Sequence, residues 1–432
     1  MFKTLVNAFK EKEIRSKLLI TLGLLFLFVL GTWIPVPGID NSVFESATSG
    51  NTFLSLLSSI NGGALANGAV LALGVSPYIT SSIIMQVLTI AIPSLEQMAK
   101  KGGEEGRRKF NKYIRYGALI LAIAQAVSIV IGFNNSGNAV TGVLFGNVLV
   151  TSIFVVLVLV AGAMFTVWLG EKITENGISN GMSLLVFVGI LSSASIQLLE
   201  TFTSIITGQA TDEMVWGVII FLVALVLIFA FIVFVDLAER KIPVTYAKQI
   251  RGRKMMGGQT ADLPLKVNSS GVIPIIFASA FLMFPQIIIS IFWPTSSFAS
   301  FWNQYLGAGS WVYSVFLALF IWAFAFFYAQ VNFKSVDIVQ HIRENGGMIA
   351  GYRPDKAVEY LDKVHNRLVL FGAIFLAFIA LIPTLIFQAI NVGTLVNAFT
   401  ATGMLIIVSV ALEFNKGLEE QIVNRNYRGF LK

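Results

Sequence analysis

The side chains best suited to chemistry in this sequence are its thirty Lys and Arg residues, and their spacing is regular. Ten long apolar stretches divide the chain. Every Lys and Arg lies in the N-terminal segment, in the second, fourth, sixth or eighth connecting segment, or in the C-terminal tail. Such side chains bind phosphates and carboxylates, and in membrane proteins they remain in the cytoplasm. The pattern therefore predicts a multi-pass membrane protein with both termini in the cytoplasm.

The apolar stretches are the elements that must position these charges. The chain is 56% hydrophobic, with a mean hydropathy of +0.79. A stretch of about 20 apolar residues crosses a hydrocarbon core about 30 Å thick. We expect an all-α polytopic membrane protein with ten transmembrane helices, at residues 18–36, 77–92, 115–132, 149–169, 182–199, 215–236, 271–293, 311–333, 368–388 and 394–413.

The interiors of these stretches have no ionisable side chains that could take part in catalysis. The interiors contain no Asp, Glu, Lys, Arg or His. Arg115, Asp236 and Glu413 lie at the ends of their stretches, and the histidines, His341 and His365, lie in a connecting segment. A charge at the centre of a membrane helix costs about 2.5–3.5 kcal/mol on insertion scales, so proteins retain one there only for function. The sequence has no cysteine and no recognisable metal cluster, nucleophile motif or phosphate loop. We therefore expect no enzymatic activity, no metal and no cofactor.

Residues 53–74 differ from the other apolar segments because glycines interrupt them. They follow the first stretch and precede Pro77, which suits the start of a helix. Non-helical backbone survives at membrane depth only when protein encloses it or when it lines a watery cavity. One interpretation is a short re-entrant element. An ordinary outside loop with a surface helix explains the same residues equally well.

The stretches divide the chain into two halves of five, residues 1–208 and 209–432. Because five is odd, the second half enters the membrane with the opposite orientation, which permits an inverted repeat. Residues 237–269 and 335–366 form two long cytoplasmic segments, and we expect both to be arms that dock a partner. The alternative is that they are solvated loops which bind anionic lipid.

Separate motifs along the chain resemble the SecY family, the central subunits of the bacterial protein-translocation channel. The segment ALGVSPYITSSIIMQVL at 72–88 resembles the second-span signature of that family. The similarity continues through GISNGMS at 177–183, LPLKVN at 263–268, GVIP at 271–274, GYRP at 351–354 and YLDK at 360–363. Several motifs in the same order make the resemblance specific.

The resemblance implies a clamshell of two inverted five-helix halves around a channel, with residues 54–73 as a re-entrant plug helix. The plug residues would be Leu54, Leu56, Ile60, Gly62, Gly63, Leu65, Leu71 and Leu73. A ring of aliphatic side chains would seal the channel at the midplane, because an uncharged neck excludes hydrated ions. By motif position this pore ring would be Val75, Ile79, Met182, Val186, Ile276 and Ile406.

The family further implies a lateral gate between the spans that begin near Pro77 and Gly271. Thr80, Gln86, Asn268 and Ser270 lie on or near those spans, and polar contacts between helices would hold the gate closed. The arms would receive the SecA motor ATPase or the rRNA of a ribosome. The docking residues would be Arg240, Lys241, Arg251, Arg253, Lys254 and Arg353.

The resemblance also names the expected partners and the expected function. Partners would be the small membrane subunits SecE and SecG, signal peptides, nascent or secretory chains, and membrane lipid. The channel would translocate unfolded polypeptides, release transmembrane segments sideways into lipid, and take its energy from the motor or from translation. The alternative function is an inverted-repeat secondary transporter of a small solute.

Overall fold

The computed structural model describes most of the chain and leaves short gaps between the described segments. It describes residues 8–50, 52–137, 140, 146–208, 212–246, 249–251, 254–256, 260–269, 271, 273–292, 296–306, 310–390 and 401–430. A helix overlaps each of the ten predicted stretches. These helices are α2 Lys12–Gly31, α5 Ser76–Ala91, α7 Gly103–Gly137, α8 Val148–Asn176, α9 Gly181–Ile206, α10 Asp212–Asp236, α11 Ile273–Phe292, α13 Trp311–Asn332, α15 Pro354–Ile390 and α17 Ala401–Phe430.

Seven helices among the described residues are long and apolar enough to cross a membrane, and a bent pair would make eight. The pair consists of Ser76–Thr89 in α5 and Pro93–Ala99, which begins with the short α6 (Pro93–Glu96), and the angle between the two is 111°. Pro93 explains the break, because proline has no amide hydrogen to continue the helix. A π-helical turn, Gln97–Lys101, follows α6. The chain is thus a multi-span membrane protein, and the count of ten spans remains a prediction.

Local sequence explains where several of these helices begin. Asn147 and Asn180 accept hydrogen bonds from the backbone amides of Leu149 and Met182, each at 3.0 Å, and so cap α8 and α9. Pro77 lies in the first turn of α5, as the sequence predicts.

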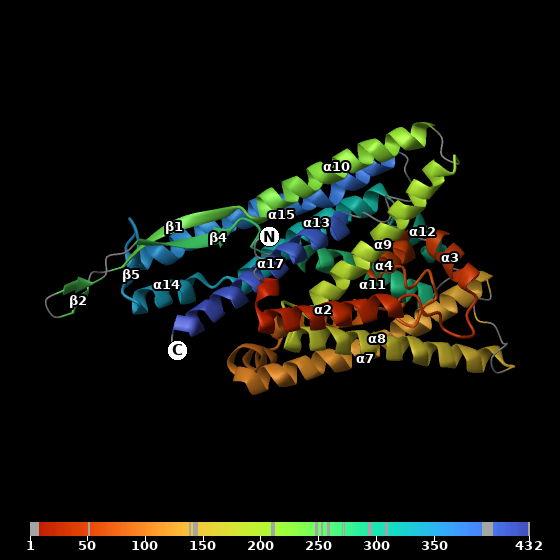
Figure 1. The fold of residues 1–432 in the computed structure, drawn as a ribbon, viewed down its shortest axis with the longest axis horizontal. Helices are drawn as coiled ribbons and strands as arrows, with labels where there is room; N and C mark the ends of the chain where they lie inside the picture. Colours follow the sequence, from red (N-terminus) through yellow and green to blue (C-terminus); the bar gives the residue numbers. More distant parts are fainter. Residues whose placement is uncertain are drawn as a thin grey trace.

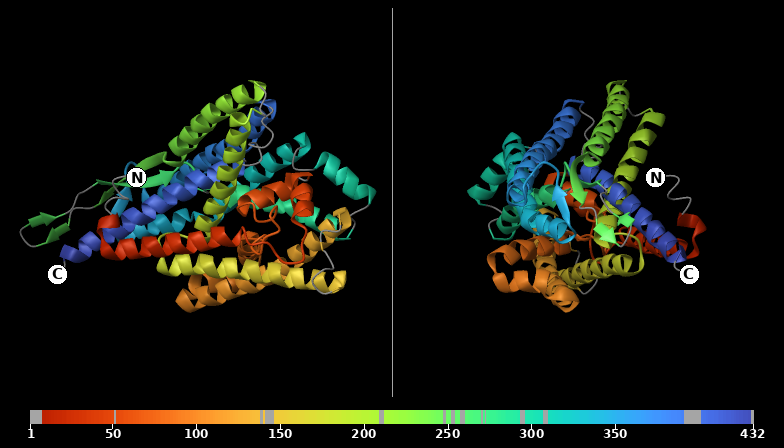
Figure 2. Two further views of the ribbon diagram at one scale, coloured as in Figure 1. Left: turned by 45° about the vertical axis from the view of Figure 1, so that its right-hand side comes forward. Right: turned by 90° about the vertical axis from the view of Figure 1, so that its left-hand side faces the viewer.

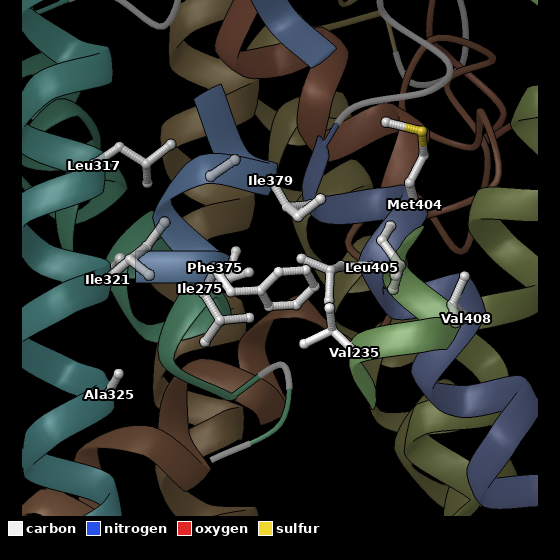
Figure 3. Packing of buried hydrophobic residues seen from close by; sticks show 14 of the residues in the cluster. Val235, Ile275, Leu317, Ile321, Ala325, Phe375, Ile379, Met404, Leu405 and Val408 are labelled. Atoms are coloured by element: carbon white, nitrogen blue, oxygen red, sulfur yellow. The ribbon is translucent and has the colours of Figure 1, made fainter. Parts of the chain in front are cut away.

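The helices form two groups (Figure 1), and each group has its own hydrophobic core. Helices α2, α7 and α8 lie on one side of the molecule, and α10, α13 and α15 lie on the other, as the turned views also show (Figure 2). In the second half, Ile275, Ile321, Phe375 and Leu405 pack together from four helices (Figure 3). A separate cluster formed by residues 36–163 is the core of the first half. This division is what two halves of a clamshell require.

A small β-sheet accompanies the helices of the predicted fold. Strand β1 (Glu239–Tyr246) pairs antiparallel with β4 (Thr260–Lys266) on one side and with β5 (Gly347–Ile349) on the other. Strands β2 (Gln249–Arg251) and β3 (Lys254–Met256) form a hairpin at the far end of the first arm. Because β1 and β5 belong to the two different predicted arms, the arms are joined by backbone hydrogen bonds.

The remaining helices are short and lie at the two ends of the bundle. Helix α14 (Ser335–Glu344) lies beside the sheet. Helices α3 (Asn41–Gly50) and α12 (Ser297–Tyr305) lie at the opposite end (Figure 1), and α4 (Thr52–Ile60) leads into a run of turns. Helix α2 begins and α17 ends at the end that carries the sheet (Figures 1 and 2).

Candidate functional site

A third hydrophobic cluster, which we call the central cluster, joins the two halves of the molecule. All six predicted ring residues belong to it, although they come from four helical segments. Val75 precedes α5, Ile79 lies on α5, Met182 and Val186 lie on α9, Ile276 on α11 and Ile406 on α17. Val75, Val186 and Ile406 are buried, and the other three are partly buried and pack against them. The structure therefore brings together residues that lie as much as 331 positions apart in the sequence.

The chemistry of the central cluster suits a seal. Its members are aliphatic or aromatic, and none carries a formal charge. A hydrated ion that entered such a contact would have to lose water without gaining a polar partner, so an apolar constriction is a barrier to ions. The thioether of Met182 packs over Gly170 of α8. An unbranched Met side chain can change shape as its neighbours move. The role of these residues as a pore ring remains a proposal.

The segment between α4 and α5 is enclosed by protein, as one of the two sequence interpretations requires. Leu65, Leu71 and Leu73 expose at most 2% of their surface. Leu65 and Leu73 pack into the core of the first half, whereas Leu71 and Ile60 pack into the central cluster. Leu54 is partly buried, and the side chain of Leu56 lies outside the described residues. The segment thus touches the predicted ring from one side.

Local hydrogen bonds satisfy much of the turn backbone in this segment. Asn61, itself buried, donates from Nδ2 to the carbonyl oxygen of Ala72 at 2.9 Å. The amide of Val70 donates to the carbonyl oxygen of Ile34, and the amide of Val36 donates to that of Gly68, each at 2.9 Å. Gly62 and Gly63 both have positive φ angles, of 74° and 81°, which favour glycine. Of the two alternatives from sequence, the structure favours the enclosed re-entrant element over a surface loop.

Two glycines on neighbouring helices make room for this segment, and sequence reasoning did not single them out. A Cβ on Gly189 of α9 would collide with the carbonyl oxygen of Ile60, and a Cβ on Gly162 of α8 would collide with that of Val70. Backbone can approach a helix this closely only where no side chain intervenes. A small residue inside an apolar stretch was the available signal, but many such positions exist in this sequence.

The predicted gate residues do not pair with one another across helices in the described structure. Thr80 donates to the carbonyl oxygen of Ser76 at 3.0 Å and Gln86 donates to the hydroxyl of Ser82 at 3.2 Å, so both bonds stay within α5. Asn268 is buried and donates instead to Oδ1 of Asp236, at 3.0 Å, at the end of α10. Ser270 lies outside the described residues. A lateral gate that includes these residues remains a proposal.

The joined arms carry exposed cations on an ordered scaffold. Arg240 and Lys241 lie opposite Leu265 and Pro264 in the β1–β4 ladder, and both are exposed. Arg251 lies opposite Lys254 in the β2–β3 ladder, although nothing is described of their side chains, and Arg253 lies outside the described residues. A core of its own supports the arms, formed by Ile242, Leu265, Ile349, Ala357 and Leu361.

Arg353 is exposed at the tight turn that connects β5 to α15. Gly351 enters this turn with φ 84°, and the carbonyl oxygen of Arg353 accepts hydrogen bonds from the amides of Lys356 and Ala357, each at 3.0 Å. Tyr352 stacks on Tyr360 with ring centroids 4.0 Å apart. The backbone of Arg353 is therefore held while its guanidinium group is free to meet a partner.

A network of polar side chains at the base of the arms was also missed from sequence. Ser335 donates to Asp362 at 2.5 Å and ties α14 to α15. Lys334 lies 4.0 Å from Glu96 of α6, so the two halves meet here through opposite charges. These residues are ordinary surface types, and only the folded chain shows that they are neighbours.

Comparison with known proteins identifies the family. Residues 69–415 match the SecY family model. Over 442 aligned residues the chain is 36% identical to the protein translocase subunit SecY of Halalkalibacterium halodurans, and the alignment covers 100% of both proteins. The chain belongs to the SecY family. The motifs at 72–88 and 177–183 are thus family motifs, and they include three of the six predicted ring positions, Val75, Ile79 and Met182.

Solved structures share the fold of this SecY-family chain. A SecY structure described as having a plug domain that stabilises the closed translocation channel matches with a TM-score of 0.64 at 19% identity, over 94% of this chain and 92% of that one. Sec61 from a canine ribosome–channel complex matches with a TM-score of 0.59, also at 19% identity and with the same coverage. The helical clamshell predicted from sequence is confirmed at the level of fold.

Proposed function

We propose that this chain is the protein-conducting channel of a bacterial plasma-membrane translocase, with both termini in the cytoplasm. It supplies a path for unfolded secretory polypeptides and releases transmembrane segments sideways into lipid. The observation that carries the proposal is the central cluster, where the six ring positions from both halves meet in one uncharged contact beside the enclosed segment between α4 and α5. A seal of this kind can open around a chain of variable sequence, because apolar contacts make no demand on a particular partner.

The channel has a cytoplasmic docking side and no energy source of its own. We assign energy supply to a SecA-type motor ATPase or to a ribosome, docked on the arms through Arg240, Lys241 and Arg353. Sec61, which matches this fold, comes from a ribosome–channel complex, and cationic tips suit both rRNA phosphates and an acidic protein surface. The same proposal includes the small subunits SecE and SecG as membrane partners.

A secondary transporter of a small solute is the less well supported of the two candidate functions. Ion-coupled carriers usually place ionisable groups at the midplane, and the interiors of the predicted spans contain none. Membership of a family whose relatives are translocase subunits points the same way.

Reconstitution tests the function directly. Vesicles containing this chain with SecE and SecG receive SecA, ATP and a secretory precursor, and translocation is scored as protection of the precursor from added protease. We expect protection that requires ATP and is lost when detergent opens the vesicles. ATP-independent protection, or none at all with intact SecA activity, contradicts the proposal. A parallel assay for uptake of small solutes addresses the transporter.

A further inference from the structure

Helix α12 carries its aromatic side chains along one face. Phe298, Phe301, Trp302 and Tyr305 have the spacing i, i+3, i+4, i+7, which places them together on a helix. Phe298, Phe301 and Tyr305 are 54%, 51% and 47% exposed, respectively. Their rings pair along the helix, with centroids 4.9 Å apart for Phe301 and Tyr305. A helix of nine residues thus presents an apolar face that the described chain leaves uncovered.

The other exposed side chains of α12 are polar but uncharged. Ser297, Ser300 and Gln304 are exposed. Successive residues of a helix are rotated by about 100°, so Ser300 lies on a different face from Phe301. No Asp, Glu, Lys, Arg or His occurs anywhere in residues 267–333. A surface without charge is poorly suited to an electrostatic partner, and an aromatic face beside a neutral polar face suits a boundary between water and hydrocarbon.

The place of α12 in the fold identifies the boundary. It contacts the ends of α11 and α13 and lies at the end of the bundle opposite the cationic sheet (Figures 1 and 2). Both neighbours present exposed apolar side chains, such as Phe281 on α11 and Trp311 on α13. The aromatic face therefore lies at the ends of two membrane helices that expose apolar side chains of their own. The cations at the other end place α12 on the outer side.

We propose that α12 is an interfacial anchor, whose aromatic face lies in the headgroup region of the outer leaflet. Aromatic side chains concentrate at this depth because an apolar ring and a polar edge meet hydrocarbon and water together. The anchor holds the outer end of α11, and the inner end of the same helix supplies Ile276 to the central cluster. Pro285 in the interior of α11 removes one helical hydrogen bond between the two ends.

The test uses spin labels on single cysteines, which is simple because the chain has none of its own. Phe301→Cys places a label on the aromatic face, and Ser300→Cys is the matched neighbour on the polar face. The labelled chain is reconstituted into vesicles of phosphatidylethanolamine and phosphatidylglycerol, and collision rates are measured with oxygen, which concentrates in lipid, and with a water-soluble nickel chelate. Leu227→Cys on α10 is the lipid reference, and Lys356→Cys in the second arm is the water reference.

We expect the ratio of oxygen to nickel collisions at residue 301 to exceed that at residue 300 severalfold and to lie between those of the water and lipid references. Water-like ratios at both positions would overturn the proposal. Protection of residue 301 from both reagents would also overturn it, because the face would then be covered by protein, such as a second copy of the chain. Lipid-like ratios at both positions would show an immersed helix and contradict an interfacial one.

Discussion

Gly189 of α9 leaves the space that the carbonyl oxygen of Ile60 occupies. A Cβ at this position would collide with that oxygen, and Gly62 approaches the same glycine from the enclosed segment. The contact matters because Ile60 belongs to the central cluster, so the position of the enclosed segment and the packing of the proposed ring depend on one another.

Gly189→Ala should loosen the enclosed segment and make the resting channel leak ions. Small-to-large substitutions in packed regions cost about 1–3 kcal/mol, and here the segment can move away to relieve the collision. Conductance across planar bilayers, measured without precursor, should rise above that of the parent protein. Gly23→Ala on α2 is the matched control, because nothing lies within 4 Å of the added methyl group. Equal conductance of the two variants would show that the segment does not seal the channel.

Ile406→Ser should also raise the resting conductance, for a different reason. Ile406 is 5% exposed within the central cluster, and a hydroxyl there offers water a hydrogen-bond partner inside an otherwise apolar contact. Ile406→Leu conserves volume and polarity and should leave conductance nearly unchanged. Leu227→Ser on α10, which is 66% exposed, controls for a polar change at a position away from the cluster. If the Ile406→Ser channel has no higher resting conductance than the Leu227→Ser channel, Ile406 does not belong to the proposed ring.

Arg353→Glu should abolish motor-driven translocation and leave the protein folded. The side chain is exposed, and its backbone is held by bonds that do not involve the guanidinium group, so charge reversal should act on docking alone. The measurement is ATP-dependent protection of a precursor in vesicles, together with SecA binding. Lys356→Glu reverses an exposed charge one helical turn away and should retain most of the activity. Normal translocation by the Arg353 variant would contradict the docking assignment.

Lys416→Gln should stabilise the folded protein near neutral pH. Burial lowers the pKa of Lys266 below its ordinary value of 10.5, and the neighbouring ammonium of Lys416 lowers this pKa further. A lysine whose pKa falls on folding costs stability at every pH below its folded pKa, and the cost disappears as the pH rises toward the unfolded pKa. Removing the neighbouring charge should raise the melting temperature at pH 7.

The gain from Lys416→Gln should shrink as the pH approaches 10.5, where the cost in the parent protein vanishes. Lys416→Arg keeps the positive charge and should show no gain. Thermal unfolding in detergent across this pH range provides the comparison. A gain that is independent of pH would mean that packing, rather than repulsion between ammonium groups, sets the stability at this position.

Much of the membrane architecture was accessible without a structure, because it depends on local composition. A helix overlaps each predicted apolar stretch, since a chain in lipid must satisfy its backbone within each span. The family motifs also contain Val75, Ile79 and Met182, which the fold brings into the central cluster. These residues could be named from the sequence because the motif at 72–88 and the motif at 177–183 each keep their residues close together in the chain.

Contacts between residues that lie far apart in the chain could not be predicted from the sequence. Nothing local to Val244 or Ile349 indicates that they pair in one sheet, yet this pairing converts two separate arms into one scaffold. In the same way Asn268 resembles any polar residue near a span until the fold places Asp236 beside it. Hydropathy and charge determined that this chain is a membrane protein with cationic segments on one side. The tertiary structure alone decided which of those segments meet, because packing and hydrogen bonds join residues by their distance in space.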